Sequence, residues 1–446
     1  MRLGALTWLL LMASAAGAQV GLPSVRLPQV PGVLPDLPAA GVALDTNKSA
    51  AALAGEVDPR RLRELRALRI RESLRRHRDV LEADPHGAPM VRGEVLALSP
   101  SAAALQAAAG AGFSVVREHS FGELGTHIVV LHASGSTARA LARLQGLDPA
   151  GVYDFNHVYT DSGALGAADM SAAQPAPAPG GVPRAAEAYG ASAVRLGLID
   201  SGVDVTHEVF SGLRIQQHGC TTAVPAEHGT AVASLMVGRA SALHGAAPGS
   251  ALYAVDVFCG LATGGAVDAV AEAFAWLLHE QVPVINVSLV GPPNRTLAGI
   301  VQNVLARGHL VVAAVGNDGP AAPPQYPAAW PGVVGVTAVD ARQQVLVEAQ
   351  RGAQVKFAAP GADMAAAQLH QGYALVRGTS FASPIVAGLL ALELHTPDPG
   401  AAQQAVAALA GRALDLGAPG LDPVYGHGLV GADLRRQPAL ALLGAH

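Results

Sequence analysis

From about residue 191 onward, runs of apolar residues alternate with segments in which apolar residues recur at helical spacing. The apolar runs predict strands and the periodic segments predict helices. The predicted strands span 194–199, 251–258, 282–289, 310–315 and 333–339, and the predicted helices span 230–238, 267–279, 296–307 and 380–394. Strands this apolar are covered on both faces, so the pattern predicts a doubly wound α/β domain over 191–446 with a mostly parallel sheet. In such folds the ligand site lies at the carboxyl ends of the strands.

A smaller α+β unit is predicted between residues 91 and 160. Four strand-like and two helical segments follow one another in the order β-α-β-β-α-β. The strands are expected at 91–98, 113–118, 126–132 and 152–159, and the helices after Pro100 and at 137–144. This order is the split βαβ, or ferredoxin-like, arrangement, in which an antiparallel sheet carries its helices on one face.

The remaining segments lack the pattern of folded domains. Residues 1–18 combine Arg2, an apolar run and the small residues Ala16-Gly-Ala, which is typical of a cleaved secretory signal, with an uncleaved anchor as the alternative. Residues 19–90 form a flexible lead-in, and residues 161–190 form a Pro-rich linker that we expect to be accessible to proteases. The signal predicts a secreted or periplasmic protein with no integral membrane segment once the signal is removed.

Composition changes this picture only locally. Half of the 446 residues are hydrophobic, 14% are charged and the formal net charge is -5, so the chain as a whole has no field that would gather nucleic acid. The segment 58–84 is the exception, because it holds nine arginines among spaced leucines and predicts a surface helix. Such helices can bind membranes or nucleic acid, but carboxylates at helical spacing favour a solvated face. We assign it no chemistry.

The chain contains two cysteines, Cys220 and Cys259. Export to an oxidising compartment favours a disulfide between them. Closing a loop of about 40 residues would stabilise the fold by about 4 kcal/mol in the chain-entropy model. The alternative is two buried free thiols that pack as small apolar side chains.

Four polar residues stand where the predicted sheet would expose chemistry. Asp200 follows the strand 194–199, Asn317 follows the strand 310–315, and His228 and Ser380 lie at the starts of helical segments. Taken alone, each is explained by turn or capping chemistry. Because independent strand ends and helix starts would bring all four to one edge of one sheet, we interpret them as one site.

The segments around three of these residues resemble the signatures of the subtilisin-like serine peptidases, the subtilases. They are Leu198-Ile-Asp-Ser-Gly-Val-Asp, His228-Gly-Thr-Ala-Val-Ala-Ser and Gly378-Thr-Ser-Phe-Ala-Ser-Pro, in the family's order of Asp, His and Ser. The likeness extends over about 191–432 and includes Gly316-Asn, Ala247-Pro-Gly, Val284-Ile-Asn-Val-Ser-Leu, Tyr326-Pro-Ala and Tyr425-Gly-His-Gly-Leu-Val-Gly-Ala. Chymotrypsin-like enzymes and α/β-hydrolases place the three catalytic residues in other orders.

The resemblance implies a serine endopeptidase that works through an acyl-enzyme. His228 would take the proton of Ser380 during attack on the scissile carbonyl, and Asp200 would orient the imidazole. Asn317 would donate a hydrogen bond to the oxyanion.

The resemblance also implies where the substrate lies. Protein or peptide substrates would extend along Ser288, Leu289 and Val290, and the facing wall of the primary pocket would be Ala314, Val315 and Gly316. Neither wall carries a charge. We therefore expect an uncharged, apolar side chain before the cut.

The small unit 91–160 is similar to the family's pro-region in topology and position. It would then guide folding, block the cleft as an intramolecular inhibitor and be released by a cut between Thr160 and Arg184. Two departures from the family's pattern are Phe381, where Met is commoner, and the stretch 200–228, which is short and has few carboxylates. Many relatives hold calcium in acid-rich loops, so calcium is unsupported here, and we predict no metal or other cofactor.

Two other functions stay open. One is an inactive relative that keeps the fold and binds proteins. The other is a serine hydrolase that acts on esters or lipids with the same three residues. Hydrolysis of casein, compared with hydrolysis of a long-chain ester, separates these classes.

Overall fold

The structure is a computed structural model that describes residues 59–161, 194–240, 243–261 and 263–435. The predicted signal, the lead-in before residue 59 and the linker from residue 162 lie outside the described residues. All described residues belong to one compact unit, residues 48–446. None of the helices described in it is both long enough and apolar enough to cross a bilayer.

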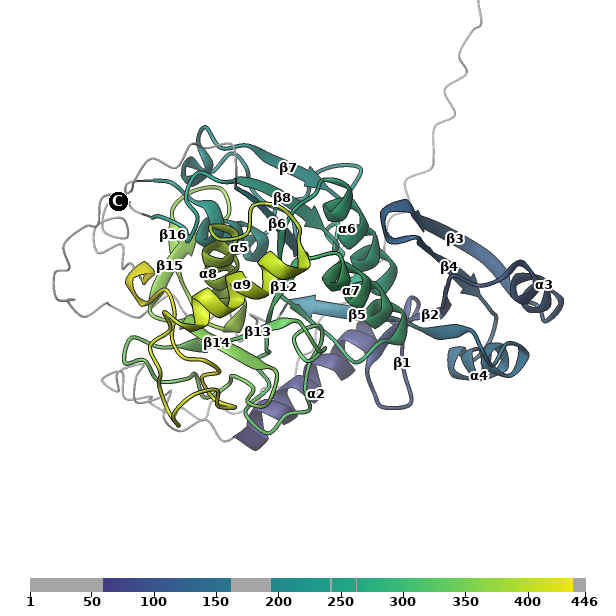
Figure 1. Cartoon of the computed structure of the whole chain (residues 1–446). Coiled ribbons are helices and arrows are strands. Elements are labelled where there is room, and N and C mark those ends of the chain that lie inside the picture. Colours follow the sequence, from purple (N-terminus) through teal and green to yellow (C-terminus); the bar gives the residue numbers. More distant parts are fainter. Residues whose placement is uncertain (1–58, 162–193, 241–242, 262, 436–446) are drawn as a thin grey trace, which may run out of the picture. The chain divides into compact units, whose positions relative to one another are not determined.

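A seven-stranded sheet forms the centre of the larger part of this unit (Figure 1). Its strands are β6 (Arg195–Asp200), β7 (Ile215–His218), β8 (Ala251–Asp256), β10 (Val284–Val287), β12 (Leu310–Ala314), β13 (Val334–Val339) and β14 (Val355–Pro360). They stand in the order β14-β13-β12-β10-β6-β8-β7, and every neighbouring pair is parallel. The predicted α/β fold with a mostly parallel sheet is confirmed.

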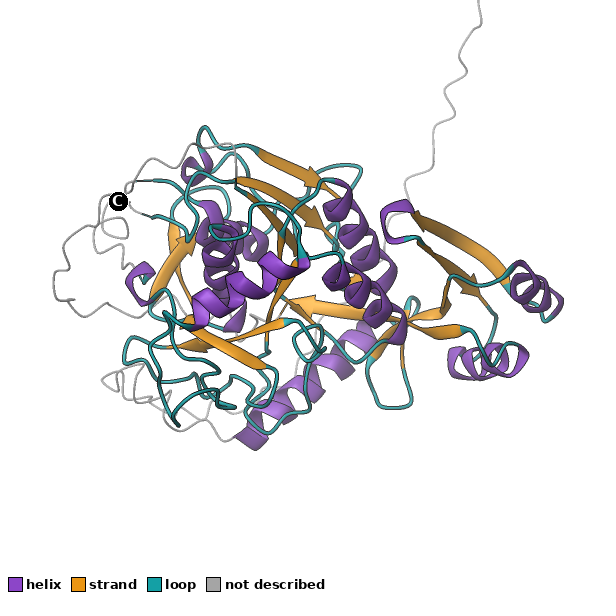
Figure 2. Ribbon diagram, viewed as in Figure 1, coloured by secondary structure: helices purple, strands orange, loops and turns teal. Residues whose placement is uncertain are grey.

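Helices cover both faces of this sheet, as Figure 2 shows. On one face lie α5 (Glu227–Val237), α8 (Thr379–Ala391) and α9 (Pro399–Ala410), and on the other lie α6 (Val267–His279) and α7 (Arg295–Ala306). Side chains alternate along a strand, so Leu196 and Leu198 of β6 join the core with α5 and α8, whereas Ile199 joins the core with α6 and α7. Each strand is thus buried on both sides, which accounts for its apolar sequence.

The N-terminal part of the described chain forms a second sheet. Its elements are β2 (Pro89–Leu98), α3 (Ala102–Gly110), β3 (Ser114–Phe121), β4 (Thr126–His132), α4 (Thr137–Leu147) and β5 (Val152–Asp161). The strands pair antiparallel in the order β5-β2-β4-β3. Val95 and Ala97 pack with α3 and α4, and the intervening Leu96 packs in the core of α6 and α7. This second sheet therefore has helices on both faces, its own on one side and those of the larger part on the other.

The Arg-rich helix is shorter than the predicted 58–84. α2 spans Pro59–Arg76, and residues 81–83 form β1 (Leu81–Ala83), which pairs antiparallel with β2. Leu81 is almost fully buried in this pairing, so burial of its side chain outweighs the helical spacing of the leucines. The predicted linker also begins one residue too early, because Asp161 still belongs to β5.

Cys220 and Cys259 form a disulfide with a Cα to Cα distance of 5.5 Å. Each cysteine follows one of two neighbouring parallel strands, β7 and β8, whose carboxyl ends lie side by side. The sheet therefore brings together two residues that are 39 positions apart in the sequence.

Replacing both cysteines with serine is expected to lower the free energy of unfolding by about 4 kcal/mol, because the unfolded chain regains the entropy of an open loop. Denaturant titration of the double variant, compared with the oxidised protein in a Ser380→Ala background, measures this loss. Reduction of the unaltered cysteines with dithiothreitol should give the same decrease. Equal stabilities of the oxidised protein and the double variant would contradict the prediction.

Candidate active site

Asp200 and His228 are in direct contact. Asp200 ends β6 and is fully buried, and His228 is the second residue of α5. Oδ1 of Asp200 lies 2.8 Å from Nδ1 of His228 and also accepts the N–H and hydroxyl of Ser201, at 2.7 and 3.1 Å. The hydroxyl of Ser201 in turn accepts the N–H of Gly229, at 3.0 Å. The strand end and the helix start are thus bound together on either side of the Asp200 and His228 pair.

The contact fixes the proton of a neutral His228. A carboxylate is only an acceptor, so Nδ1 carries the proton and Nε2 is left as the basic nitrogen. Nε2 is buried and has no hydrogen-bond partner among the described residues. His228 can therefore act as a base through Nε2.

The pKa of His228 depends on burial, on Asp200 and on the charge of Asp161. Burial lowers it, but the charge of Asp200, the hydrogen bond to Asp200 and the charge of Asp161 raise it to about 9. Asp161 ends β5 in the N-terminal sheet. Because an imidazolium cannot accept a proton, a raised pKa opposes the action of His228 as a base, and the charge of Asp161 adds to this effect.

Ser380 is the second residue of α8, in a turn that is bound to the segment after β10. Pro384 has no N–H, so the carbonyl of Ser380 has no donor four residues along the helix. The hydroxyl of Ser288 donates to that carbonyl instead, at 3.0 Å, and lies 3.1 Å from the hydroxyl of Ser383. The ring of Phe381 lies 5.4 Å from the ring of His228, which puts the first turn of α8 beside the imidazole.

Asn317 is held with its amino group unpaired. Its Oδ1 accepts the N–H of Thr379, the residue before Ser380, at 3.1 Å. The N–H of Gly316 donates to the hydroxyl of the same Thr379, at 3.2 Å. Nδ2 of Asn317 is buried without a hydrogen-bond partner among the described residues. A buried unpaired donor is costly, so this group is suited to an acceptor that arrives from outside.

The predicted substrate segments lie at the carboxyl ends of β10 and β12, the edge of the parallel sheet where Asp200 ends β6. β11 (Leu289–Val290) pairs antiparallel with residues 160 and 161 of β5. A second short strand, β9 (Gly265–Ala266), pairs with residues 158 and 159 of β5 and was not predicted. Two residues are too short a segment to show a strand period, and the signal that could have drawn attention to this segment is the pair Gly264-Gly265. The predicted wall 314–316 is fully buried at the end of β12.

The structure thus brings the predicted residues to neighbouring strand ends and helix starts. Two of the contacts are direct, between Asp200 and His228 and between Ser288 and Ser380. Asn317 reaches the same helix turn through Thr379. The side chain of Ser288 is used inside the protein, so any role of Ser288 in holding a peptide falls to its main chain.

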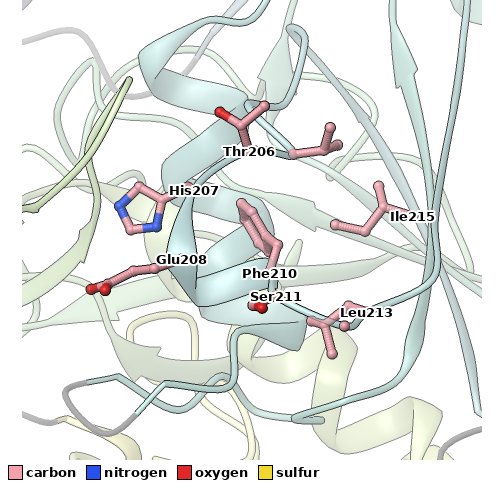
Figure 3. A pocket seen from close by; sticks show the side chains of 9 residues that line it. Thr206, His207, Glu208, Phe210, Ser211, Leu213 and Ile215 are labelled. Carbon is pink, nitrogen blue, oxygen red and sulfur yellow. The ribbon is translucent and has the colours of Figure 1, made fainter.

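A hollow elsewhere on the surface is lined by residues 205–208, 210–213 and 215 (Figure 3). Two of its polar side chains, His207 and Glu208, are bound within the protein. Nε2 of His207 lies 2.8 Å from the carbonyl of Gly372, and the hydroxyl of Tyr373 donates to Glu208 at 2.9 Å. None of the predicted site residues lines it.

Among the described residues, one group of side chains has the proximity of metal ligands, namely Cys220, Asp256 and Cys259. Both sulfurs are bonded to each other in the disulfide, so they are not available as thiolate ligands. That the protein uses no metal or other cofactor stays a prediction.

Comparison with known proteins extends these observations. The model of a family described as "Subtilase family" matches residues 191–428, slightly more than half of the chain. The chain is 34% identical over 253 residues to subtilisin Savinase from Lederbergia lenta, which covers 54% of this chain and 90% of Savinase. It is 30% identical over 243 residues to the minor extracellular protease Epr from Bacillus subtilis (strain 168), which covers 53% of this chain and 37% of Epr.

Among solved structures, the chain is similar to fervidolysin from Fervidobacterium pennivorans, described as a keratinolytic enzyme related to subtilisin. The two share a TM-score of 0.62 and 20% sequence identity, over 78% of this chain and 61% of the fervidolysin chain. At this identity the likeness is one of fold.

Replacing Asp161 with Asn is expected to lower the pKa of His228, because the Asp161 charge favours the imidazolium. NMR titration of His228 in Ser380→Ala protein, with and without Asp161→Asn, measures the change. Asp79→Asn removes an exposed carboxylate outside this site and is the matched control, which should leave the titration unaltered. A titration unaltered by Asp161→Asn as well would show that Asp161 does not act on His228.

Proposed function

The chain belongs to the subtilase family of serine peptidases, and we propose that it is a secreted endopeptidase that cuts peptide bonds through Asp200, His228 and Ser380. The observation that carries the proposal is the 2.8 Å contact between Nδ1 of His228 and the buried carboxylate of Asp200. Nε2 then takes the proton of Ser380 as Oγ bonds to the scissile carbonyl carbon, and gives that proton to the leaving amine. Water releases the acyl group by the same steps.

Oxyanion stabilisation falls to Asn317 and to the N–H of Ser380. The unpaired Nδ2 of Asn317 supports this role, because its orientation is set by the Thr379 contact and does not have to change during the reaction. The start of a helix also supplies main-chain N–H groups that favour negative charge.

We further propose that the N-terminal sheet is a pro-region that blocks the cleft. β5 adds to the edge strands β9 and β11, where an extended peptide would make the same main-chain hydrogen bonds. Tyr159 anchors it, since its ring is buried and its hydroxyl donates to the carbonyl of Pro292 at 2.7 Å. A Cβ at position 291 would lie 2.7 Å from that ring, so Gly291 is needed for this approach. Substrate and β5 exclude each other.

The proposal predicts self-processing. Expressed without residues 1–18, the wild type is expected to lose a fragment that ends between residues 160 and 190 and to digest casein. Ser380→Ala should stay full-length and inert, because it lacks the nucleophile. Intact mass and the rate of casein hydrolysis measure both outcomes, and Ser211→Ala, which alters an exposed serine, should behave as the wild type.

Other outcomes point to the alternatives. If wild type and Ser380→Ala both stay full-length, fold normally and leave casein and a serine-directed phosphonylating probe untouched, the chain is a binding relative and no enzyme. Cleavage of a long-chain ester without cleavage of casein would favour an ester hydrolase.

Asn317→Ala is expected to lower kcat for casein peptides by about 10²–10³-fold, the effect measured for such a donor in a subtilisin. Thermal unfolding should show that the variant still folds. Asn303→Ala, on α7, removes an amide outside the site and should keep full activity. An Asn317→Ala enzyme with unaltered kcat would show that Asn317 does not contact the oxyanion.

A further inference from the structure

We propose that Asp318, Gln325 and Gln350 form a site for a basic side chain, so that the enzyme prefers arginine or lysine before the cut. This inference rests on the proposed function and names its substrate class. It revises the expectation of an apolar side chain, which considered only residues 288–290 and 314–316. The charge comes from Asp318, two residues beyond Gly316.

Gln325 and Gln350 lie against the predicted pocket wall at Gly316, and Asp318 contacts Gln325. Asp318 directly follows Asn317, and its side chain is 16% exposed. Gln325 approaches Gly316 so closely that a Cβ there would lie 1.9 Å from its Oε1, and the same Cβ would lie 3.5 Å from Cδ of Gln350. Gly316 also has a φ of +104°, which favours glycine. The wall thus lacks a side chain where the two amides face it.

The cluster offers hydrogen-bond acceptors, namely two amide oxygens and a carboxylate. Nε2 of Gln325 donates to Asp318, and Nε2 of Gln350 donates to the carbonyl of Pro323 at 2.9 Å, so both Oε1 atoms point elsewhere. Gln325 is 4% exposed and Gln350 is 0% exposed, and neither Oε1 has a hydrogen-bond partner among the described residues. Buried acceptors without donors are uncommon. Guanidinium and ammonium groups carry donors only, and they match two amide oxygens and a carboxylate.

The chain itself brings a guanidinium to Asp318. Nη1 of Arg66 in α2 donates to Oδ2 of Asp318, across 252 positions of sequence. Burial lowers the pKa of Arg66 to about 10, which leaves it charged at neutral pH. Six other arginines of α2 are exposed, namely Arg61, Arg63, Arg69, Arg71, Arg75 and Arg76. Arg66 precedes the proposed cut, so release of the N-terminal part after the cut would remove it and leave Asp318 open to a basic side chain of the substrate.

The test compares matched peptides that differ only in the residue before the cut, arginine, lysine or leucine, with self-processed wild-type enzyme. We expect kcat/KM to be about tenfold or more higher for arginine and lysine than for leucine. In Asp318→Asn the ratio of arginine to leucine should fall by about 10–100-fold, the range for loss of a charged hydrogen-bond partner. Asp433→Asn, an exposed carboxylate in the C-terminal segment, should keep the wild-type ratio.

A second measurement needs no variant. Benzamidine, which carries a cationic amidine, should inhibit the processed wild type competitively, and benzyl alcohol at the same concentration should not. Active enzyme that prefers leucine, or that ignores benzamidine and keeps its ratio in Asp318→Asn, would overturn the inference and leave the proposed function standing. Wild type that cleaves none of the peptides and does not react with the phosphonylating probe would instead refute the proposed function.

Discussion

The position of Ser380 depends on a carbonyl that its own helix cannot satisfy. Pro384 removes the donor that would normally bind it, and the hydroxyl of Ser288 takes that place. On the other side of the same turn, Thr379 accepts from Gly316 and donates to Asn317. The first turn of α8 is therefore bound to the segments that follow β10 and β12. A shift of this turn would break hydrogen bonds to both, so its place relative to the sheet edge is tightly constrained.

The parallel sheet explains why few side-chain contacts are enough to assemble the site. Carboxyl ends of parallel strands meet at one edge, and each helix that follows a strand starts near that edge. Asp200, Ser288 and Asn317 come from three neighbouring strand ends and need only turn toward one another. The disulfide lies at the ends of the next two strands, β8 and β7. The disulfide therefore stabilises the same edge of the sheet that carries the site residues. The buried apolar strands fix the positions from which these residues extend.

The apolar strands β6, β8, β10, β12 and β13 and the residues that follow them could be predicted from the sequence, because burial on both faces leaves a clear pattern. β14 is also mostly buried but was not predicted, because Lys356 and Pro360 interrupt its apolar run. Short or mixed elements could not. β7 is a partly exposed edge strand that reads Ile-Gln-Gln-His, and β9 has only two residues. α9 is rich in alanine, with three buried positions, and gives a weak periodic signal. The acceptor cluster could not be predicted either, because Asp318, Gln325 and Gln350 lie on separate turns and meet only in three dimensions.

The N-terminal part contacts the larger part at a second place, the start of α6, besides the strands β9 and β11. Asp268, in the first turn of α6, accepts Arg117 at 2.8 Å and Asn156 at 3.0 Å, both from the N-terminal sheet. Burial raises the pKa of Asp268, but the nearby His119, the charge of Arg117 and hydrogen bonds from Asn156 and Arg117 lower it to about 2. These contacts join residues on opposite sides of a cut after β5, and none of them involves the residues next to the cut. If the chain is cut there, the N-terminal part is still held by this network, so cleavage and release are separate steps, and the second one opens the cleft.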